Sequence, residues 1–137
     1  MITQIIKMIS SALAKLSDQS TYGTHSLIQE ANNNFAQGEY FAHLAAQHHQ
    51  EYLLHHSDTL TDLSLTDSRN AMWGFLNAAV RGHREAQYKL GLGYLNGEYG
   101  LERNFNQAEL WLKKAAAQGH PLAINTLNQA YQQIAFS

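Results

Sequence analysis

The sequence predicts an all-helical domain built as a short solenoid of paired helices. The main observation is an internal repeat, because Gly82-His83 recurs as Gly119-His120, 37 residues further along the chain. Further alanine, leucine and tyrosine positions match under the same shift and follow a helical rhythm. A period in the thirties is typical of paired-helix solenoids. No segment of useful length shows the alternation expected of a strand.

The repeated stretch reads locally as a joint between two helices. A helix is expected through residues 106–118, and Gly119 follows it where a left-handed C-terminal residue is needed. Pro121 suits the first turn of the next helix, where its missing N–H is not required. Asn104 is expected to cap the helix that follows it, and Asp67 is its equivalent one repeat earlier. The repeat therefore predicts two such joints.

The length and composition set limits on what the chain can be. With 137 residues and 45% apolar residues, it fits one globular domain spanning 1–137. The absence of cysteine excludes a disulfide framework, a thiol nucleophile and a thiolate metal site. The net charge of −2 is divided unevenly, with −5 over residues 1–68 and +3 over residues 69–137.

The first part of the chain matches the repeat poorly. Helices are predicted near 2–17, 25–37 and 39–56, with Gly38 separating the last two. Residues 1–56 are interpreted as a helical N-terminal cap or a degenerate repeat. Residues 57–68 are interpreted as a loop, and residues 69–137 as the repeats proper.

The first helix carries regularly spaced apolar residues. Ile2, Ile5, Ile6, Ile9, Leu13 and Leu16 recur at helical spacing. We expect an amphipathic helix that packs on its own protein; a membrane-surface helix and an atypical export signal stay open as alternatives. No apolar run approaches the roughly 20 residues of a membrane span. These features favour a cytoplasmic protein without a membrane partner.

The histidine-rich segment 43–56 raises the alternative of a metal site. His48, Glu51 and His55 share one helix face, because they are spaced by three and four residues. A zinc or iron ion would still need ligands from another helix. Solvated or partner-facing histidines are the favoured interpretation, so no cofactor is expected.

Catalysis and nucleic-acid binding are not predicted. No strand–turn–helix elbow surrounds any serine, and the glycine-rich stretch 91–100 lacks the lysine of a phosphate-binding loop. The basic residues are few and scattered over several predicted helices.

Residues 85–120 resemble a Sel-one-like repeat, a relative of the tetratricopeptide repeat. The residues that carry the resemblance are Ala86, Leu90, Gly91, Tyr94, Gly97, Gly100, Ala108, Trp111, Ala115, Ala116 and Gly119. The loop glycines are spaced more widely than the family's usual Gly-x-Gly, and Asn104 stands where the family tends to have Asp. The resemblance implies a right-handed stack of antiparallel helix pairs that acts as a non-enzymatic scaffold, and bacterial versions often serve as adaptors.

A protein or peptide is therefore the expected partner, and the oligomeric state is left open. A solenoid presents a groove from its first helices together with loops between repeats. The candidate contact residues are Tyr88, Asn96, Tyr99, Asn125 and Asn128, since Tyr and Asn side chains combine contact area with hydrogen bonding. Trp73 and Trp111 are expected in the core. A bacterial adaptor or an immunity-type inhibitor of a toxin is the specific form of this hypothesis.

Overall fold

The computed structural model describes residues 2–133, apart from the side chains of residues 13–22. This part of the chain forms five helices: α1 (Ile2–His55), α2 (Asp58–Val80), α3 (Arg84–Asn96), α4 (Phe105–Ala117) and α5 (Pro121–Gln132). Residues 2–133 contain no strand. The predicted all-helical class is confirmed.

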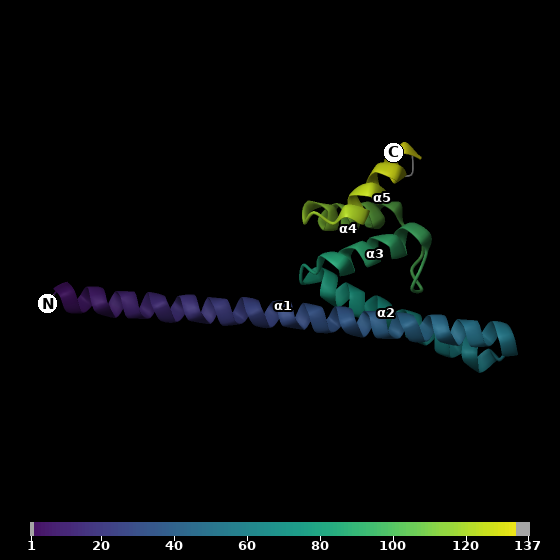
Figure 1. The fold of residues 1–137 in the computed structure, drawn as a ribbon, viewed down its shortest axis with the longest axis horizontal. Helices are drawn as coiled ribbons and strands as arrows, with labels where there is room; N and C mark the ends of the chain where they lie inside the picture. Colours follow the sequence, from purple (N-terminus) through teal and green to yellow (C-terminus); the bar gives the residue numbers. More distant parts are fainter. Residues whose placement is uncertain (1, 134–137) are drawn as a thin grey trace.

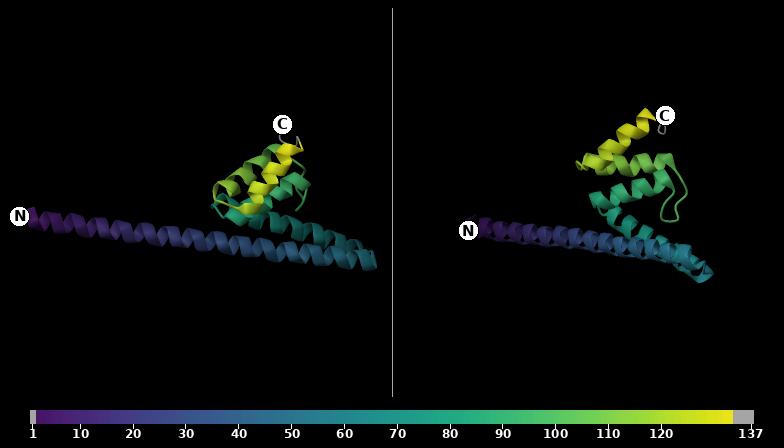
Figure 2. Two further views of the ribbon diagram at one scale, coloured as in Figure 1. Left: turned by 45° about the horizontal axis from the view of Figure 1, so that its top comes forward. Right: turned by 45° about the vertical axis from the view of Figure 1, so that its right-hand side comes forward.

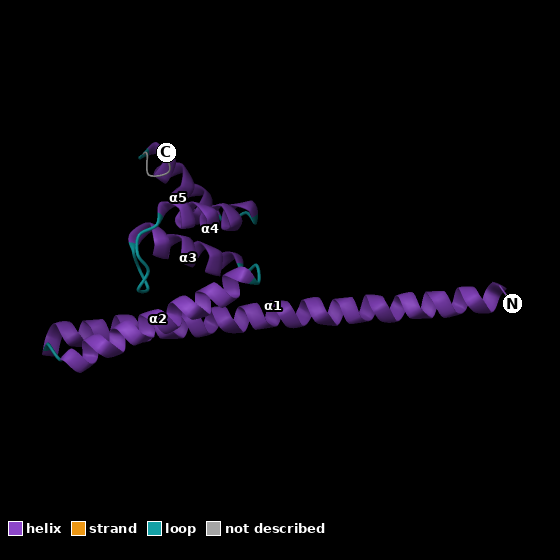
Figure 3. Cartoon of the chain, turned by 180° about the vertical axis from the view of Figure 1, so that it is seen from behind, coloured by secondary structure: helices purple, strands orange, loops and turns teal. Residues whose placement is uncertain are grey.

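The helices stack in chain order. Each one packs against the next, and neighbours run in opposite directions (Figure 1). The long α1 lies beside α2, and α3, α4 and α5 rise from that pair in steps, as the two further views also show (Figure 2). The connections are short except for the α3–α4 loop, which hangs down beside α3 (Figure 3). This arrangement confirms the predicted solenoid of antiparallel helix pairs.

Small residues allow the helices to lie close together. One core cluster joins α2, α3 and α4 through Ala78, Ala79, Ala86, Leu90 and Trp111. A second joins α4 and α5 through Leu112, Ala115, Ala123 and Leu127. At Gly91 an added Cβ would lie 2.7 Å from Leu112 Cγ, so a side chain there would separate α3 from α4. The repeated alanines and glycines are thus contact positions.

The predicted helix breaks, one between residues 17 and 25 and one at Gly38, are wrong. Gly38 lies inside α1, which runs without interruption from Ile2 to His55. A Cβ at Gly38 would lie 2.7 Å from Phe75 Cδ1, and one at Gly74 would lie 2.6 Å from the Gly38 nitrogen. Gly38 therefore serves close packing of α1 on α2.

The predicted loop at 57–68 is also wrong. Only His56 and Ser57 separate α1 from α2, and the predicted loop forms the first turns of α2. Asp67 is therefore a mid-helix residue and not a cap, and its carboxylate lies 2.8 Å from His48 Nδ1 on α1. Ser64 likewise donates a hydrogen bond to the Ala45 carbonyl at 2.9 Å. Contacts with α1 hold this polar segment helical, which local propensity does not predict.

The two tryptophans have different environments. Trp111 is buried, as expected, whereas Trp73 is 56% exposed. Ala71, Gly74 and Phe75 form the buried side of α2, which leaves Trp73 on the outer side.

The start of α1 does not pack on its own protein. It projects well beyond the other helices (Figure 1), and Ile2 is 76% exposed and Ile9 55% exposed. The expectation that these residues are covered by the chain itself is wrong for Ile2, Ile5, Ile6 and Ile9. Leu13 and Leu16 lie outside the described side chains.

Candidate protein-binding surface

The two Gly-His pairs form the repeated joints between helices. Gly82 and Gly119 have φ values of +90° and +78°, in the left-handed region that favours glycine. The histidine that follows each glycine caps the next helix: His83 Nδ1 accepts from the Ala86 N–H at 3.2 Å, and His120 Nδ1 accepts from the Ala123 N–H at 3.1 Å. The sequence showed the pairing but not this capping role, which Ser, Thr, Asp or Asn more often fills.

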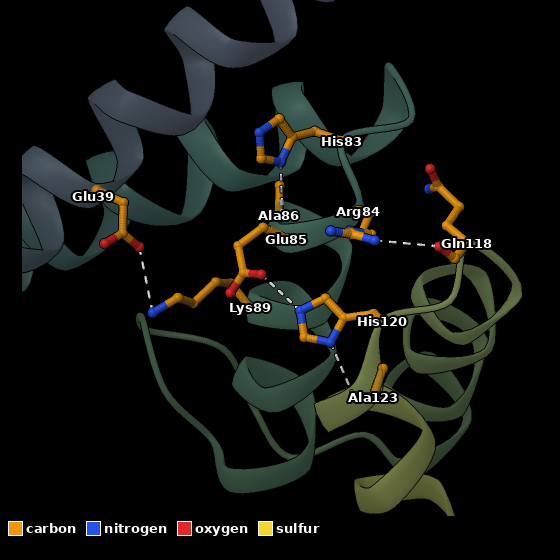
Figure 4. A network of polar contacts seen from close by, with 9 residues as sticks. All are labelled: Glu39, His83, Arg84, Glu85, Ala86, Lys89, Gln118, His120 and Ala123. Atoms are coloured by element: carbon orange, nitrogen blue, oxygen red, sulfur yellow. Dashed lines mark hydrogen bonds and ion pairs between the residues drawn. The ribbon is translucent and has the colours of Figure 1, made fainter.

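The second joint is tied to the first through side chains (Figure 4). His120 Nδ1 accepts a hydrogen bond, so Nε2 carries the ring proton and donates to Glu85 Oε2 at 2.7 Å. Gln118 Nε2 donates to the Gly82 carbonyl at 2.9 Å. Tyr88 stacks on the His120 ring at a centroid distance of 4.4 Å. These contacts hold the joint between α4 and α5 against α3 and the first joint.

The first joint is held against α1. The His83 ring stacks on Phe35, with the ring centroids 4.4 Å apart. Burial lowers the pKa of His83 below its ordinary value of 6.5, and the charge of Arg84 acts in the same direction. A lowered pKa favours the neutral ring, whose Nδ1 can accept the capping hydrogen bond. The neutral histidine is thus part of this joint.

A groove opens between α1, α2 and the α3–α4 loop, with a volume of about 820 Å³. We call it the α1–loop groove. It is lined by Ala42, Ala45, Ala46, His49, Ser64, Ser68, Gly97, Glu98 and Tyr99. Three segments that are distant in the sequence therefore build one concave surface, with small apolar residues from α1 and hydroxyl groups from α2.

Tyr99 is held in a fixed position at this groove. Its φ of +56° lies in the left-handed region, which is uncommon for a residue with a side chain. Its ring meets Phe75 edge-on at a centroid distance of 5.2 Å, and burial raises the pKa of its hydroxyl above 10.0. The core therefore supports the loop side of the groove.

An ion pair joins α3 to α1 near the same loop. Lys89 Nζ lies 3.4 Å from Glu39 Oε1 (Figure 4). Burial acts to lower the pKa of Lys89, but the Glu39 carboxylate and the neighbouring Tyr99 outweigh it and the net pKa is raised above 10.5. Lys89 is therefore a charged brace between the two helices.

The five predicted contact residues do not form one site. Tyr99 lines the α1–loop groove, and Asn96 lines a smaller cleft of about 270 Å³ together with Thr126 and Gln129 of α5. Asn125 and Asn128 are exposed on α5, whereas Tyr88 is half-buried against His120. Whether any of them contacts a partner stays a prediction.

Sequence reasoning missed the residues of α1 and α2 that complete the groove. Ser64 and Ser68 were assigned to a loop, Ala46 was given no role, and His49 was grouped with the solvated or partner-facing histidines of 43–56. Their spacing offered a weak signal, because 42, 45, 46 and 49 share one helix face. That signal gains meaning only once α1 is known to face the α3–α4 loop.

The alternative metal site receives no support. Of the three residues His48, Glu51 and His55, the first has its Nδ1 2.8 Å from Asp67 Oδ2, and the other two are exposed. Among the side chains that the structure describes, no group of three or more His, Cys, Asp or Glu residues is arranged to hold a metal ion.

The fold and the two joints define a helical-repeat protein. The family model of the Sel1 repeat matches residues 84–120, which span α3, the α3–α4 loop, α4 and the second joint. The chain thus carries a Sel1 repeat, and the resemblance seen in the sequence is confirmed. Sel1 repeats generally mediate interactions between proteins and are scaffolds without catalytic activity.

No curated protein and no solved structure matches the chain. Within residues 2–133, no helix combines the length and apolar character that a membrane crossing requires.

Proposed function

We propose that this protein is a non-enzymatic binding module that holds a protein or peptide segment in the α1–loop groove. The observation that carries the proposal is the groove itself, an open hollow of about 820 Å³ that α1, α2 and the α3–α4 loop border. This volume falls in the range of pockets that bind ligands. The interaction role of Sel1 repeats supports the same function class.

The lining of the groove suits a polypeptide. Ala42, Ala45 and Ala46 offer a shallow apolar floor without bulky side chains. Ser68, His49 and the Tyr99 hydroxyl can form hydrogen bonds, which a peptide backbone offers at every residue. An aromatic ring with a polar end is also a common element of protein interfaces.

The finer forms of this function are a bacterial adaptor and an immunity-type inhibitor that occludes a toxin. Both need a surface that binds one partner without chemistry, and the groove supports this requirement. A cytoplasmic place of action stays part of the same proposal.

The test is a substitution that fills the groove without touching the core. Ala46 lines the groove and is exposed, so Ala46→Arg adds a long charged side chain where a partner would lie. Ala36 is also exposed on α1 and does not line the groove. Ala36→Arg therefore makes the same chemical change on the same helix and serves as the control.

The tagged wild type and both variants are used for capture from the native cell at moderate salt, with mass spectrometry. We expect the wild type and Ala36→Arg to retain one partner in stoichiometric amount. Ala46→Arg should reduce capture at least about ten-fold, because a charge buried without a partner costs more than about 1.4 kcal/mol. Equal capture by Ala46→Arg would exclude the groove as the binding site.

A further inference from the structure

The first turns of α1 expose an apolar face that nothing in the described residues covers. We call residues 2–28 the N-terminal arm, and at 1.5 Å per residue it is about 40 Å long. Its exposed apolar residues are Ile2, Ile5, Ile6, Met8, Ile9, Leu27 and Ile28. Helices in proteins owe most of their stability to the packing of an apolar face against another surface. A second surface that covered this face would therefore stabilise the arm.

The exposed face continues the seam by which α1 packs on α2. Gly38 and Ala45 lie 36 residues after Ile2 and Ile9, which is about ten turns of an α-helix, so each pair points in nearly the same direction. Gly38 and Ala45 are buried, and Gly38 contacts Phe75 of α2. The same face of one continuous helix is thus covered by α2 in its second half and open in its first at the side chains that the structure describes, those of residues 2–12 and 23–28.

The boundary between the two halves is sharp. Ala31 is 4% exposed, whereas Ile28 is 63% exposed. At this point α2 ends, and Arg81 just beyond it reaches Glu30 with its Nη2 2.8 Å from Oε1. A second helix entering the open half of the seam would therefore meet the end of α2 near residue 30.

We propose that the arm pairs with the arm of a second copy of this chain, in antiparallel orientation. The inference rests on the arm alone and is independent of the binding role of the α1–loop groove. Two copies would form a two-fold symmetric dimer, the commonest form of homo-oligomer. Each arm would fill the open seam of the other.

The position of α2 determines the direction of the pairing. In a parallel pair, both chains would run past residue 31 side by side, and the α2 helix on each seam would separate the two α1 helices. In an antiparallel pair, the two solenoid bodies lie at opposite ends of the paired arms (compare Figure 1). The antiparallel pair keeps the arms in contact without bringing the two α2 helices together.

The spacing of the arm residues also supplies a register. Ile2, Ile6 and Ile9 follow the alternating steps of four and three residues that are typical of a coiled coil, and Gly23 and Leu27 fall on the same pattern. Opposed in antiparallel fashion, Ile2 faces Leu27 and Ile6 faces Gly23 of the other copy. An added Cβ at Gly23 meets nothing within 4 Å, so this position has room for the isoleucine.

The charge of the arm favours a second copy over a lipid surface. Residues 2–28 contain two lysines, Lys7 and Lys15, and one acidic residue, Asp18. Two lysines give weak attraction to anionic lipid, since stable binding of an amphipathic helix usually uses a strongly basic polar face. The same low charge causes little repulsion between two arms.

Dimerisation would give the protein two α1–loop grooves on one rod. Two linked grooves raise the effective concentration at the second site, so a partner with two binding segments would be held more tightly than by one chain.

The first experiment measures the molar mass of the full chain by sedimentation equilibrium. We expect twice the 15.4 kDa of one chain. Replacing Ile6 and Ile9 by Glu puts charges into the seam and should weaken the dimer at least about ten-fold. The control replaces Gln4 and Ser11 by Glu, which adds the same charge to exposed positions on the opposite face and should leave the dimer intact.

The second experiment uses the absence of cysteine in the chain. A variant with both Ile6→Cys and Gly23→Cys should form a covalent dimer on oxidation. The two cysteines of one chain are about 25 Å apart along the helix, too far for an internal disulfide. Each single variant should stay monomeric on a non-reducing gel, because in an antiparallel pair the two identical positions lie about 25 Å apart along the arms. A parallel pair would instead bring them together and cross-link the single variants.

Four results would overturn the proposal. A wild type that sediments at 15.4 kDa would remove the dimer. A dimer that persists after the Ile6 and Ile9 substitutions would show that the arm seam is not the interface. Cross-linking of the single cysteine variants would show that the arms do not pair in antiparallel orientation. A monomer that binds phosphatidylcholine–phosphatidylserine vesicles through Ile6 and Ile9 would assign the arm to lipid instead.

Discussion

Gly74 gives the sharpest test of how α1 and α2 fit together. A Cβ at this position would lie 2.6 Å from the Gly38 nitrogen, 2.7 Å from its Cα and 2.9 Å from the Asn34 carbonyl oxygen. All three atoms belong to the backbone of α1, so no side-chain rotation relieves the contact. Gly74→Ala must therefore push the two helices apart.

The size of the effect follows from two opposing contributions. Overpacking in a tight contact costs about 1–3 kcal/mol, and loosening the α1–α2 seam adds to this. Replacing glycine by alanine inside a helix returns about 1 kcal/mol. We expect a net loss of about 1–2 kcal/mol in the free energy of unfolding, which corresponds to a fall of roughly 4–8 °C in the melting temperature of a domain of this size.

Gly23→Ala is the matched control, because Gly23 is also inside α1 and its added Cβ meets nothing within 4 Å in the same chain. Because Gly23 lies in the proposed seam between two arms, the comparison is made at a protein concentration low enough that the arms do not pair. Thermal and urea unfolding, followed by circular dichroism, measure both variants against the wild type. Gly23→Ala should not lower the unfolding midpoint. If Gly74→Ala were as stable as the wild type, the close approach of α1 and α2 at this point would be refuted.

The other predictions concern the first joint and the core. Burial lowers the pKa of His83 below 6.5 in the folded state. As the pH falls, the unfolded chain therefore takes up the proton before the folded chain does. The stability that the neutral cap contributes is present above pH 6.5 and is lost as the pH falls through the lowered pKa. His83→Asn keeps a capping oxygen but does not titrate. The variant should therefore lose less of its free energy of unfolding between about pH 8 and about pH 5 than the wild type does, as measured by denaturation at both pH values. An equal loss would contradict the role of neutral His83 as the cap. Leu112 is fully buried, and Leu112→Ala should lower the unfolding free energy by about 2–5 kcal/mol. Lys113 is exposed and pairs with Glu109 at 2.7 Å, so water screens the pair and Lys113→Ala should change the free energy of unfolding far less than Leu112→Ala does; similar losses for both would refute the assignment of the buried and exposed faces of α4.

The repeated half of the chain was predictable because its signals are local. Gly119 takes the left-handed conformation and Pro121 begins α5, as expected. Asn104 caps α4 by accepting from the Gln107 N–H at 3.1 Å. Each of these assignments depends on backbone geometry within a few residues, which residue type largely determines.

The wrong predictions from the sequence concern residue types that can serve two structural purposes. Glycine ends helices at Gly82 and Gly119, but at Gly38 it permits contact with α2 inside a helix. Aspartate caps helices, but Asp67 meets His48 across the α1–α2 seam. In both cases the deciding atom lies on another helix, far away in the sequence.

The candidate site was predictable only in part for the same reason. Tyr99 stood out in the sequence as a loop residue suited to contacts, and it lines the groove. Ala46 and Ser64 gave no comparable signal, because a small residue becomes part of a groove only through the walls around it.

The sequence by itself determined the class of the protein, the two Gly-His joints and the course of α3, α4 and α5. The reason is that the same residues, with the same backbone preferences, occur twice in the chain at a fixed spacing. The tertiary structure decided the continuity of α1, the extent of α2, the α1–loop groove and the open seam of the N-terminal arm. These features depend on which surfaces meet. A one-dimensional pattern shows which residues can be buried, whereas the packing of α2 shows which of them are.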